Sequence, residues 1–246
     1  MDRMLYVAMS GAKQIMQAQA VTAHNLANIS TTGFRADLTA ARSMPLQGGG
    51  QPSRVYPMST TAGTETASGK LITTGRDLDV AVNDKGWIAV QTPDGREAYT
   101  RAGNMRVTET GQLLTGSGHP VLGNAGAIAI PPAEKLEIGD DGTVSIRPLG
   151  QQPQALAVID RIKLVNPESE QLVKGSDGLM HLKSGGVSPP DAGVSLVSGT
   201  LESSNVNAVE QMVSMLELAR QFEMQVKMMS TAQEMDSSSA QLMRIR

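Results

Sequence analysis

Apolar and small residues recur along the first 29 residues at alternating steps of three and four, which gives a period of about 3.5. Such a period predicts a helix with one stripe facing another helix. Gln19 and Thr22 are polar members of the stripe, and polar side chains at such positions tend to fix the register of the pairing. The stripe consists of Met1, Leu5, Ala8, Ala12, Ile15, Gln19, Thr22, Leu26 and Ile29.

A second row, formed by Met9, Met16 and Ala23, lies beside this stripe. The apolar face is therefore wider than a two-stranded seam requires, and we expect the helix to contact more than one partner. The helix is expected to end at residues 30–33, because Gly33 can adopt the left-handed conformation that terminates helices.

The C-terminal region repeats this behaviour over about four heptads. Asn207 followed by Glu210 resembles a capping box at the start of a second helix. At about 1.5 Å per residue the two helices would reach about 40 and 55 Å. An ordinary hairpin within one chain is the alternative, but a single antiparallel pair would leave a wide Ala and Met face in water, so we expect copies to pack together. The predicted stripe of this helix steps through Met212, Met215, Ala219, Phe222, Val226 and Met229.

The residues between the helices have a different pattern. Residues 36–70 are rich in Thr, Ser, Gly and Pro and predict an extended connector. Residues 71–200 alternate short β-type runs such as Leu78–Val82 and Trp87–Gln91 with turn signals such as Asp94-Gly95. The predicted fold is α+β, with long terminal helices paired in a coiled-coil-like core and an all-β domain between them. The predicted segments are an N-terminal assembly helix (1–35), the connector (36–70), the all-β domain (71–200) and a C-terminal assembly helix (201–246).

Composition excludes several classes of partner and site but does not by itself indicate a function. A formal net charge of −3 gives no electrostatic reason to expect nucleic acid or anionic lipid as a partner. The absence of Cys excludes disulfides, thiolate metal sites and a catalytic thiol. The N-terminus lacks the apolar core of a signal peptide, and the sequence has no run of the roughly 20 apolar residues that a membrane helix needs. Direct membrane insertion is therefore not expected.

Candidate catalytic residues are few. His24, His119 and His181 are scattered, and none has a second ligand type at metal spacing. Asp77 and Asp79 share a face of a predicted strand and could hold a cation or act as paired carboxylates. The simpler interpretation is that Asp77 caps a turn and Asp79 satisfies a neighbouring backbone group or Arg101.

Two further motifs have equally ordinary explanations. Residues 140–143 are better explained as a hairpin than as a calcium loop, because the later acidic ligands are missing. Ser117 lies between two glycines without the pattern of a nucleophile elbow. We therefore predict no catalytic residue, no metal ligand and no cofactor.

Three stretches together resemble the axial family of bacterial flagellar rod and hook proteins. Their order and spacing cover almost the whole chain, and the first and third are specific signals. Within this family the chain is most similar to proximal rod members, and the distal rod protein is the nearest competitor. The features that carry this similarity are the overall length, Met1-Asp2 with Tyr6, Ala8 and Met9, and residues 220–225. The stretches are residues 25–28 with 30–35, residues 78–82 with Gly86-Trp87 and 99–103, and residues 199–202 with 204–207.

The resemblance implies a structural subunit of the proximal rod that polymerises through its terminal helices into a tube that transmits torque and encloses an export channel. It implies copies of itself, other rod proteins and the flagellar type III export apparatus as partners, and a rod location across the periplasm, reached without a cleaved signal peptide. The alternatives are a distal rod subunit, or a secreted β-domain enzyme or glycan-binding protein with helical oligomerisation arms, which Asp77, Asp79 and Trp87 suggest. The predicted assembly interface comprises Leu5, Ala8, Ala12, Ile15, Gln19, Thr22, Asn25, Leu26, Asn28, Ile29, Gly33, Phe34, Leu201, Asn205, Val206, Met212, Met215, Ala219, Phe222, Val226 and Met229.

Overall fold

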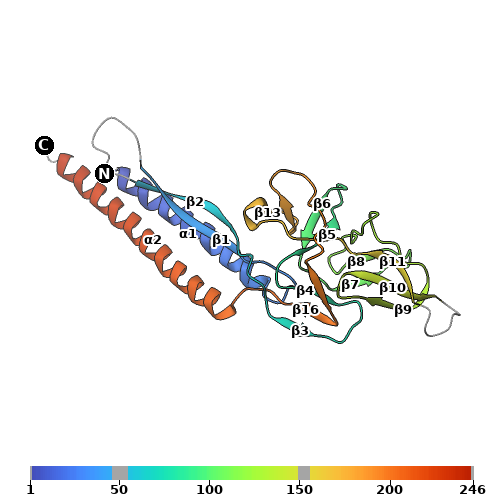
Figure 1. Ribbon diagram of the computed structural model, residues 1–246. Helices are drawn as coiled ribbons and strands as arrows, with labels where there is room; N and C mark the ends of the chain where they lie inside the picture. The colour runs from blue at the N-terminus through green and yellow to red at the C-terminus, as the bar shows by residue number, and fades with distance from the viewer. Residues whose placement is uncertain (1, 46–54, 149–155, 245–246) are drawn as a thin grey trace. The chain divides into compact units, whose positions relative to one another are not determined.

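The computed structural model describes residues 2–45, 55–148 and 156–244 (Figure 1). The chain divides into two compact units. A helical unit holds Met1–Asn28, Asp37–Gly63 and Val206–Arg246, and a β unit holds Ile29–Ala36 and Thr64–Asn205. Together they form the α+β fold that the sequence predicts.

Two long helices form the frame of the helical unit. Helix α1 spans Asp2–Ala27 and helix α2 spans Ala208–Arg244. They run side by side in opposite directions (Figure 1). Gly11 marks a close approach, since a Cβ added there would lie 3.3 Å from the Cδ atom of Gln225. The start of α2 follows from its sequence, because the Asn207 side chain accepts a hydrogen bond from the Val209 backbone N–H at 3.1 Å.

The expected connector contains a pair of strands. β1 (Asp37–Pro45) and β2 (Val55–Thr64) form a two-stranded sheet, and β1 contacts α1. The Asn25 side chain on α1 holds the start of β1 through two hydrogen bonds of 2.9 Å, one to each backbone polar group of Asp37. The Thr, Ser and Gly content of this segment concealed its pairing, because these residues are also typical of unpaired loops.

The β unit confirms a multi-stranded region between the helices. Its sheets are β12-β5-β6-β14-β13, β11-β10-β9, β15-β4, β16-β3 and β7-β8, and every described pairing is antiparallel. The strands are β3 (Leu71–Thr73), β4 (Val80–Asn83), β5 (Trp87–Gln91), β6 (Glu97–Thr100), β7 (Met105–Val107), β8 (Leu113–Thr115), β9 (Ala133–Ile138), β10 (Thr143–Pro148), β11 (Ala157–Arg161), β12 (Leu164–Val165), β13 (Leu172–Lys174), β14 (Met180–Leu182), β15 (Ser195–Ser198) and β16 (Thr200–Glu202), with a 3-10 turn at Ser169–Gln171.

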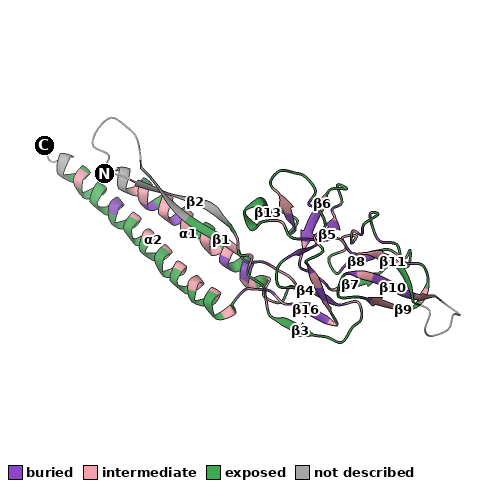
Figure 2. Ribbon diagram, viewed as in Figure 1, coloured by how far each residue is buried: buried purple, intermediate pink, exposed green. Residues whose placement is uncertain are grey.

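Strand β5 separates two apolar clusters. Ile88 and Val90 point into the larger cluster, whereas Trp87 and Ala89 point into the smaller one, as the period of two along a strand requires. Both faces of this strand are therefore buried. Figure 2 shows buried residues concentrated in the β unit, while much of the surface of α2 is exposed.

Candidate assembly site

The predicted stripe of α1 is the covered side of that helix. Ala8, Ala12, Thr22 and Asn25 are buried. Thr22 donates its hydroxyl hydrogen to the Ala18 carbonyl at 3.0 Å, which satisfies this buried polar group within the helix. The half-buried members of the predicted set in this region are Leu5, Ile15, Gln19, Leu26, Asn28 and Ile29.

On α2 the row of residues that packs against the rest of the helical unit differs from the predicted stripe. We call it the covered row; every second member lies one residue before the predicted one. Met215, Phe222 and Met229 are half-buried as members of both rows, but Met212 and Val226 are exposed. The sequence alone could not decide between the two rows. Both contain Met215, Phe222 and Met229, and both alternate steps of three and four. The covered row runs through Ala208, Gln211, Met215, Leu218, Phe222, Gln225, Met229 and Ala232.

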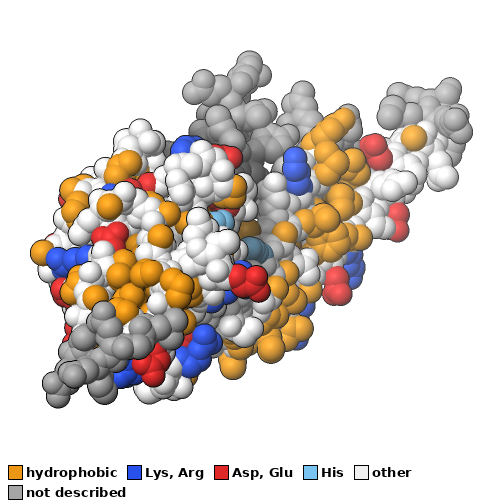
Figure 3. Space-filling view, turned by 90° about the vertical axis from the view of Figure 1, so that its right-hand side faces the viewer, with side chains coloured by type: hydrophobic (Ala, Val, Ile, Leu, Met, Phe, Trp, Pro, Cys, Tyr) orange, Lys and Arg blue, Asp and Glu red, His pale blue; other side chains and the backbone are white. Residues whose placement is uncertain are grey.

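Large apolar side chains remain exposed on both helices. Met9 and Met16 on α1 are exposed, as is the smaller Ala23, so the whole second row of the sequence pattern lies in solvent. Leu216 on α2 keeps 63% of its surface exposed. Figure 3 shows hydrophobic side chains gathered in continuous strips on the surface of the molecule. The exposed large apolar residues of α2 are Val209, Met212, Val213, Leu216, Met224, Val226, Met228 and Met235.

Within the β unit, a buried ionic cluster joins the residues that follow α1 to those that precede α2. Arg35 Nη2 lies 2.6 Å from Glu202 Oε1, and Arg101 Nη1 lies 3.0 Å from Glu202 Oε2. The backbone N–H of Gly69 also donates to Glu202 Oε1, at 2.7 Å. One fully buried carboxylate is thus held by two guanidinium groups and a backbone amide.

The indole of Trp87 lies against both arginines. The guanidinium carbons of Arg35 and Arg101 are 5.7 and 5.3 Å from the ring centroid, within the range of cation–π attraction. Burial lowers the pKa of Arg101, and the nearby Glu202 carboxylate opposes that change. Two positive charges with one negative charge are tolerated here because the carboxylate and the aromatic face both stabilise the cations.

Gly33 permits this arrangement. Its φ is +67°, and a Cβ at this position would lie 2.3 Å from the carbonyl carbon of Arg101. Its backbone N–H donates to the Glu202 carbonyl oxygen at 2.8 Å. A side chain at position 33 would therefore separate the two backbone segments that carry the cluster.

Asn205 is a second connecting residue in the β unit. Its side-chain oxygen accepts from the Ala36 N–H at 2.8 Å, and its side-chain nitrogen donates to the Glu65 and Ala67 carbonyls at 3.1 Å each. Phe34 is half-buried, with the Lys174 ammonium 3.9 Å from its ring centroid. Leu201 is half-buried in the β unit, whereas Val206 belongs to the helical unit and is buried.

Sequence reasoning missed the charged cluster as a site. Arg35, Arg101 and Glu202 each lie in one of the three stretches that carry the family resemblance, and that common feature was the available signal. Charged residues are almost never fully buried unless they are paired. Pairing partners separated by 101 and 167 residues cannot be read from a linear pattern.

The predicted carboxylate pair is not assembled. Asp79 is buried and accepts a hydrogen bond from the Thr74 hydroxyl at 2.7 Å, with Arg76 Nη1 3.8 Å away, whereas Asp77 is exposed. The partners of the Asp79 side chain are thus Thr74 and Arg76 and not Arg101. Within the described ranges, no group of three or more His, Cys, Asp or Glu side chains could hold a metal ion.

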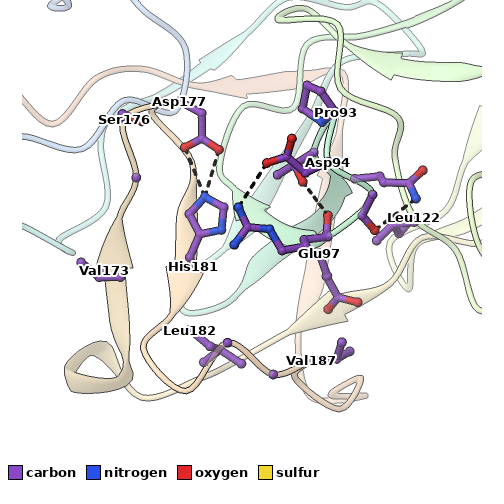
Figure 4. Close-up of a pocket in the computed structure, with 17 residues that line it drawn as sticks. Pro93, Asp94, Glu97, Leu122, Val173, Ser176, Asp177, His181, Leu182 and Val187 are labelled. Atoms are coloured by element: carbon purple, nitrogen blue, oxygen red, sulfur yellow. Dashed lines mark hydrogen bonds and ion pairs between the residues drawn. The ribbon is translucent and has the colours of Figure 1, made fainter.

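A cavity of the β unit with a volume of about 700 Å³ lies beside β14 (Figure 4). His181 Nε2 points toward Asp177 and lies 3.0 Å from its Oδ2, and Arg96 pairs with Asp94 at 3.2 Å. Ser176 precedes Asp177 in the chain, but no hydrogen bond of the described residues joins Ser176 to His181, as a nucleophile and its base would require.

Three family models match the chain in the order of its elements. A flagella basal body rod protein model matches residues 5–35, a flagellar hook protein FlgE/F/G D1 domain model matches residues 81–146, and a flagellar basal body rod FlgEFG protein C-terminal model matches residues 197–242.

No helix in the described part of the chain is long and apolar enough to cross a membrane.

Curated relatives match over nearly the full length. The flagellar basal-body rod protein FlgF of Escherichia coli K12 is 43% identical, and that of Salmonella typhimurium LT2 is 42% identical, each over 99% of both chains. The flagellar basal-body rod protein FlgG of Bacillus subtilis is 33% identical over 95% of this chain and 96% of its own.

Proposed function

The chain belongs to the family of flagellar rod and hook proteins, and from this premise we propose that it is a structural subunit of the proximal rod of the flagellar basal body. The observation that carries the proposal is the identity of 43% over 99% of both chains with a relative named as basal-body rod protein FlgF. The distal rod protein remains the alternative within the family, supported by an identity of 33% with an FlgG protein. The higher identity favours the proximal rod.

The helical unit is the part of the chain that would polymerise. Its exposed apolar residues, among them Met16 and Leu216, have no cover within the unit that hides them from water. Burying such surface against neighbouring subunits releases about 25 cal/mol per Å² of apolar area. The terminal helices, paired in a coiled-coil-like core, would thus form a tube that transmits torque and encloses the export channel. The predicted interface residues on α1 and α2 would line the contacts of this tube.

The β unit would brace neighbouring subunits, and no chemical step is required of it. The partners are copies of this chain, other rod proteins and the type III export apparatus, and the location is the basal body, in the part of the rod that spans the periplasm. A secreted glycan-binding module receives less support, because both guanidinium groups of the buried cluster occupy the neighbourhood of the Trp87 ring that a sugar would need.

Deletion of the gene in the bacterium that encodes this chain tests the proposal. We expect isolated basal bodies to end below the distal rod in electron micrographs, and a plasmid copy of the full chain to restore complete rods and swimming. As a control, a copy with a stop codon in place of Ala208 should restore neither. Complete rods in the deletion strain would refute the proposal.

A further inference from the structure

The methionines divide according to the unit that holds them. Among those whose side chains the structure describes, six on α1 and α2 are exposed and two on α2 are half-buried. Met105 and Met180 in the β unit keep only 1% and 4% of their surface exposed, and they belong to its larger and its smaller apolar cluster. The six exposed methionines are Met9, Met16, Met212, Met224, Met228 and Met235.

Three of the exposed methionines lie on one side of α2. Met228 follows Met224 by four residues and precedes Met235 by seven, and at about 3.6 residues per turn such steps return to the same face of a helix. Met224 keeps 60% of its surface in solvent. We call Met224, Met228 and Met235 the methionine stripe; none of them belongs to the covered row. The stripe extends over about 16 Å of the helix.

An exposed thioether is open to oxidation by a peroxide. A lone pair of the sulfur attacks one oxygen of hydrogen peroxide, the O–O bond breaks as the S–O bond forms, and the second oxygen leaves as water with both peroxide protons. The sulfur loses an electron pair, the peroxide gains it, and the product is methionine sulfoxide. The chain contains no Cys, so no thiol of this protein competes for the oxidant.

Sulfoxide formation would change the surface of the helical unit and leave the β unit intact. It converts a flexible apolar side chain into a polar one, whose new oxygen needs a hydrogen-bond donor when it is buried. The exposed methionines of α1 and α2 are part of the apolar surface that the proposed rod would cover. Met105 and Met180 are enclosed in the apolar clusters, so the β unit would keep its core.

We propose that the exposed methionines of α1 and α2 are a reversible oxidation site for peroxides, and that sulfoxides in the methionine stripe keep a free chain out of the rod. The second part rests on the proposed function, whereas the first depends only on the exposure of the thioethers. Methionine sulfoxide reductases remove the added oxygen, so an oxidised chain regains its apolar surface. Incorporation of the subunit therefore depends on the balance between peroxide and reductase.

Peptide mapping by mass spectrometry tests the first part. The purified full-length chain would be treated with hydrogen peroxide, and the oxygen gained by each methionine would be followed over time. We expect the six exposed methionines to be oxidised at least about tenfold faster than Met105 and Met180, which serve as internal controls. The fluorescence of Trp87 should stay unchanged while the exposed set reacts. Equal rates for the two sets, or a change in Trp87 fluorescence that accompanies oxidation of the exposed set, would overturn this part.

Substitution of the methionine stripe tests the second part, because Gln has nearly the length of Met and carries a polar oxygen. In cells that lack the natural copy, we expect the full-length chain with Met224→Gln, Met228→Gln and Met235→Gln to reach isolated basal bodies at about one fifth of the natural amount or less. The matched control carries Met224→Leu, Met228→Leu and Met235→Leu, which keep the surface apolar without a thioether, and it should incorporate normally. Equal amounts of the two variants would overturn the assigned role of the stripe.

A peroxide challenge of the natural chain gives a measurement that needs no substitution. Synthesis of the chain would be induced in cells exposed to hydrogen peroxide, with and without methionine sulfoxide reductases directed to the periplasm. We expect peroxide to lower the amount of chain in basal bodies by about fivefold and the reductases to restore most of it. The leucine variant should lose much less under the same conditions.

Two outcomes of the challenge would contradict the second part of the proposal. They are an equal loss of the natural chain and the leucine variant, and a loss of the natural chain that the reductases do not reverse. If the natural chain is missing from basal bodies without any peroxide, the proposed function fails instead, and the peptide map still decides the first part.

Discussion

Arg35 and Glu202 are 167 residues apart in the chain, yet their side chains lie 2.6 Å from each other in the interior of the β unit. Arg35 follows α1 and Glu202 precedes α2, so the ion pair joins the segment after the first helix to the segment before the second. Because Arg101 shares the same carboxylate, removal of Glu202 would leave two buried cations without a counter-charge.

Substitution of this carboxylate should destabilise the β unit strongly. We expect Glu202→Gln to lower the free energy of unfolding by about 3–5 kcal/mol, because breaking a buried ion pair leaves its partners uncompensated. Urea unfolding followed by the fluorescence of Trp87, the sole Trp, measures this loss at the cluster itself. Glu137→Gln is the control, because the side chains of Glu137 and its partner Lys135 keep 43% and 44% of their surface exposed, and it should leave the urea midpoint almost unchanged. Equal midpoints for both variants would contradict the assigned role of the cluster.

Gly33 should not tolerate a side chain. We expect Gly33→Ala to lower the free energy of unfolding by more than about 1 kcal/mol, because the left-handed φ and the contact with the Arg101 backbone both oppose a Cβ. Gly75→Ala is the matched control, since Gly75 has a similar φ of +72° but no atom within 4 Å of where its Cβ would lie. In urea unfolding, we expect the midpoint to fall further for Gly33→Ala than for Gly75→Ala. The same shift at both positions would show that φ alone matters.

A charge in the covered row of α2 should prevent assembly. We expect Phe222→Asp to abolish swimming, because the carboxylate would be partly removed from water, without a partner, where the aromatic ring is half-buried. The fluorescence of Trp87 should stay as in the unaltered chain, because the β unit does not contain this position. Ser230→Asp, at an exposed position of the same helix, should swim normally. Normal swimming of the Phe222→Asp strain would contradict the covered row.

The stability of the β unit should decline at high pH through Tyr99. Burial raises the pKa of Tyr99 to about 12, although a hydrogen bond donated by the Ser188 N–H to its oxygen opposes the rise. The unfolded phenol ionises near pH 10, so between about pH 10 and 12 the folded state holds a proton that the unfolded state has lost. The contribution of Tyr99 to the free energy of unfolding should therefore be constant below pH 10 and fall from pH 10 to 12.

Urea midpoints measured between pH 8 and 12 check this titration. Tyr99→Phe has no phenol to ionise, so its midpoint should decline less steeply over the same range. It should begin from a lower stability at pH 8, because the Ser188 N–H loses its acceptor. Parallel curves for the two proteins would assign the decline to other groups.

The sequence by itself determined the fold class and most of the elements, but not the paired strands β1 and β2 in the expected connector. The three-and-four spacing located both terminal helices, and the Asn207 cap located the start of the second to within a residue. Turn signals and alternating runs identified the β region, and three motif stretches identified the family. These features depend on local spacing, which the chain displays directly.

Tertiary structure decided which of several allowed partners each residue takes. On α2 the spacing allows two rows through Met215 and Phe222, and packing against the rest of the helical unit selected the one that contains Gln211 and Gln225. It also paired β1 with β2 and gathered Arg35, Arg101 and Glu202 around Trp87. Such choices compare the free energies of contacts between residues far apart in the chain, which no local pattern contains.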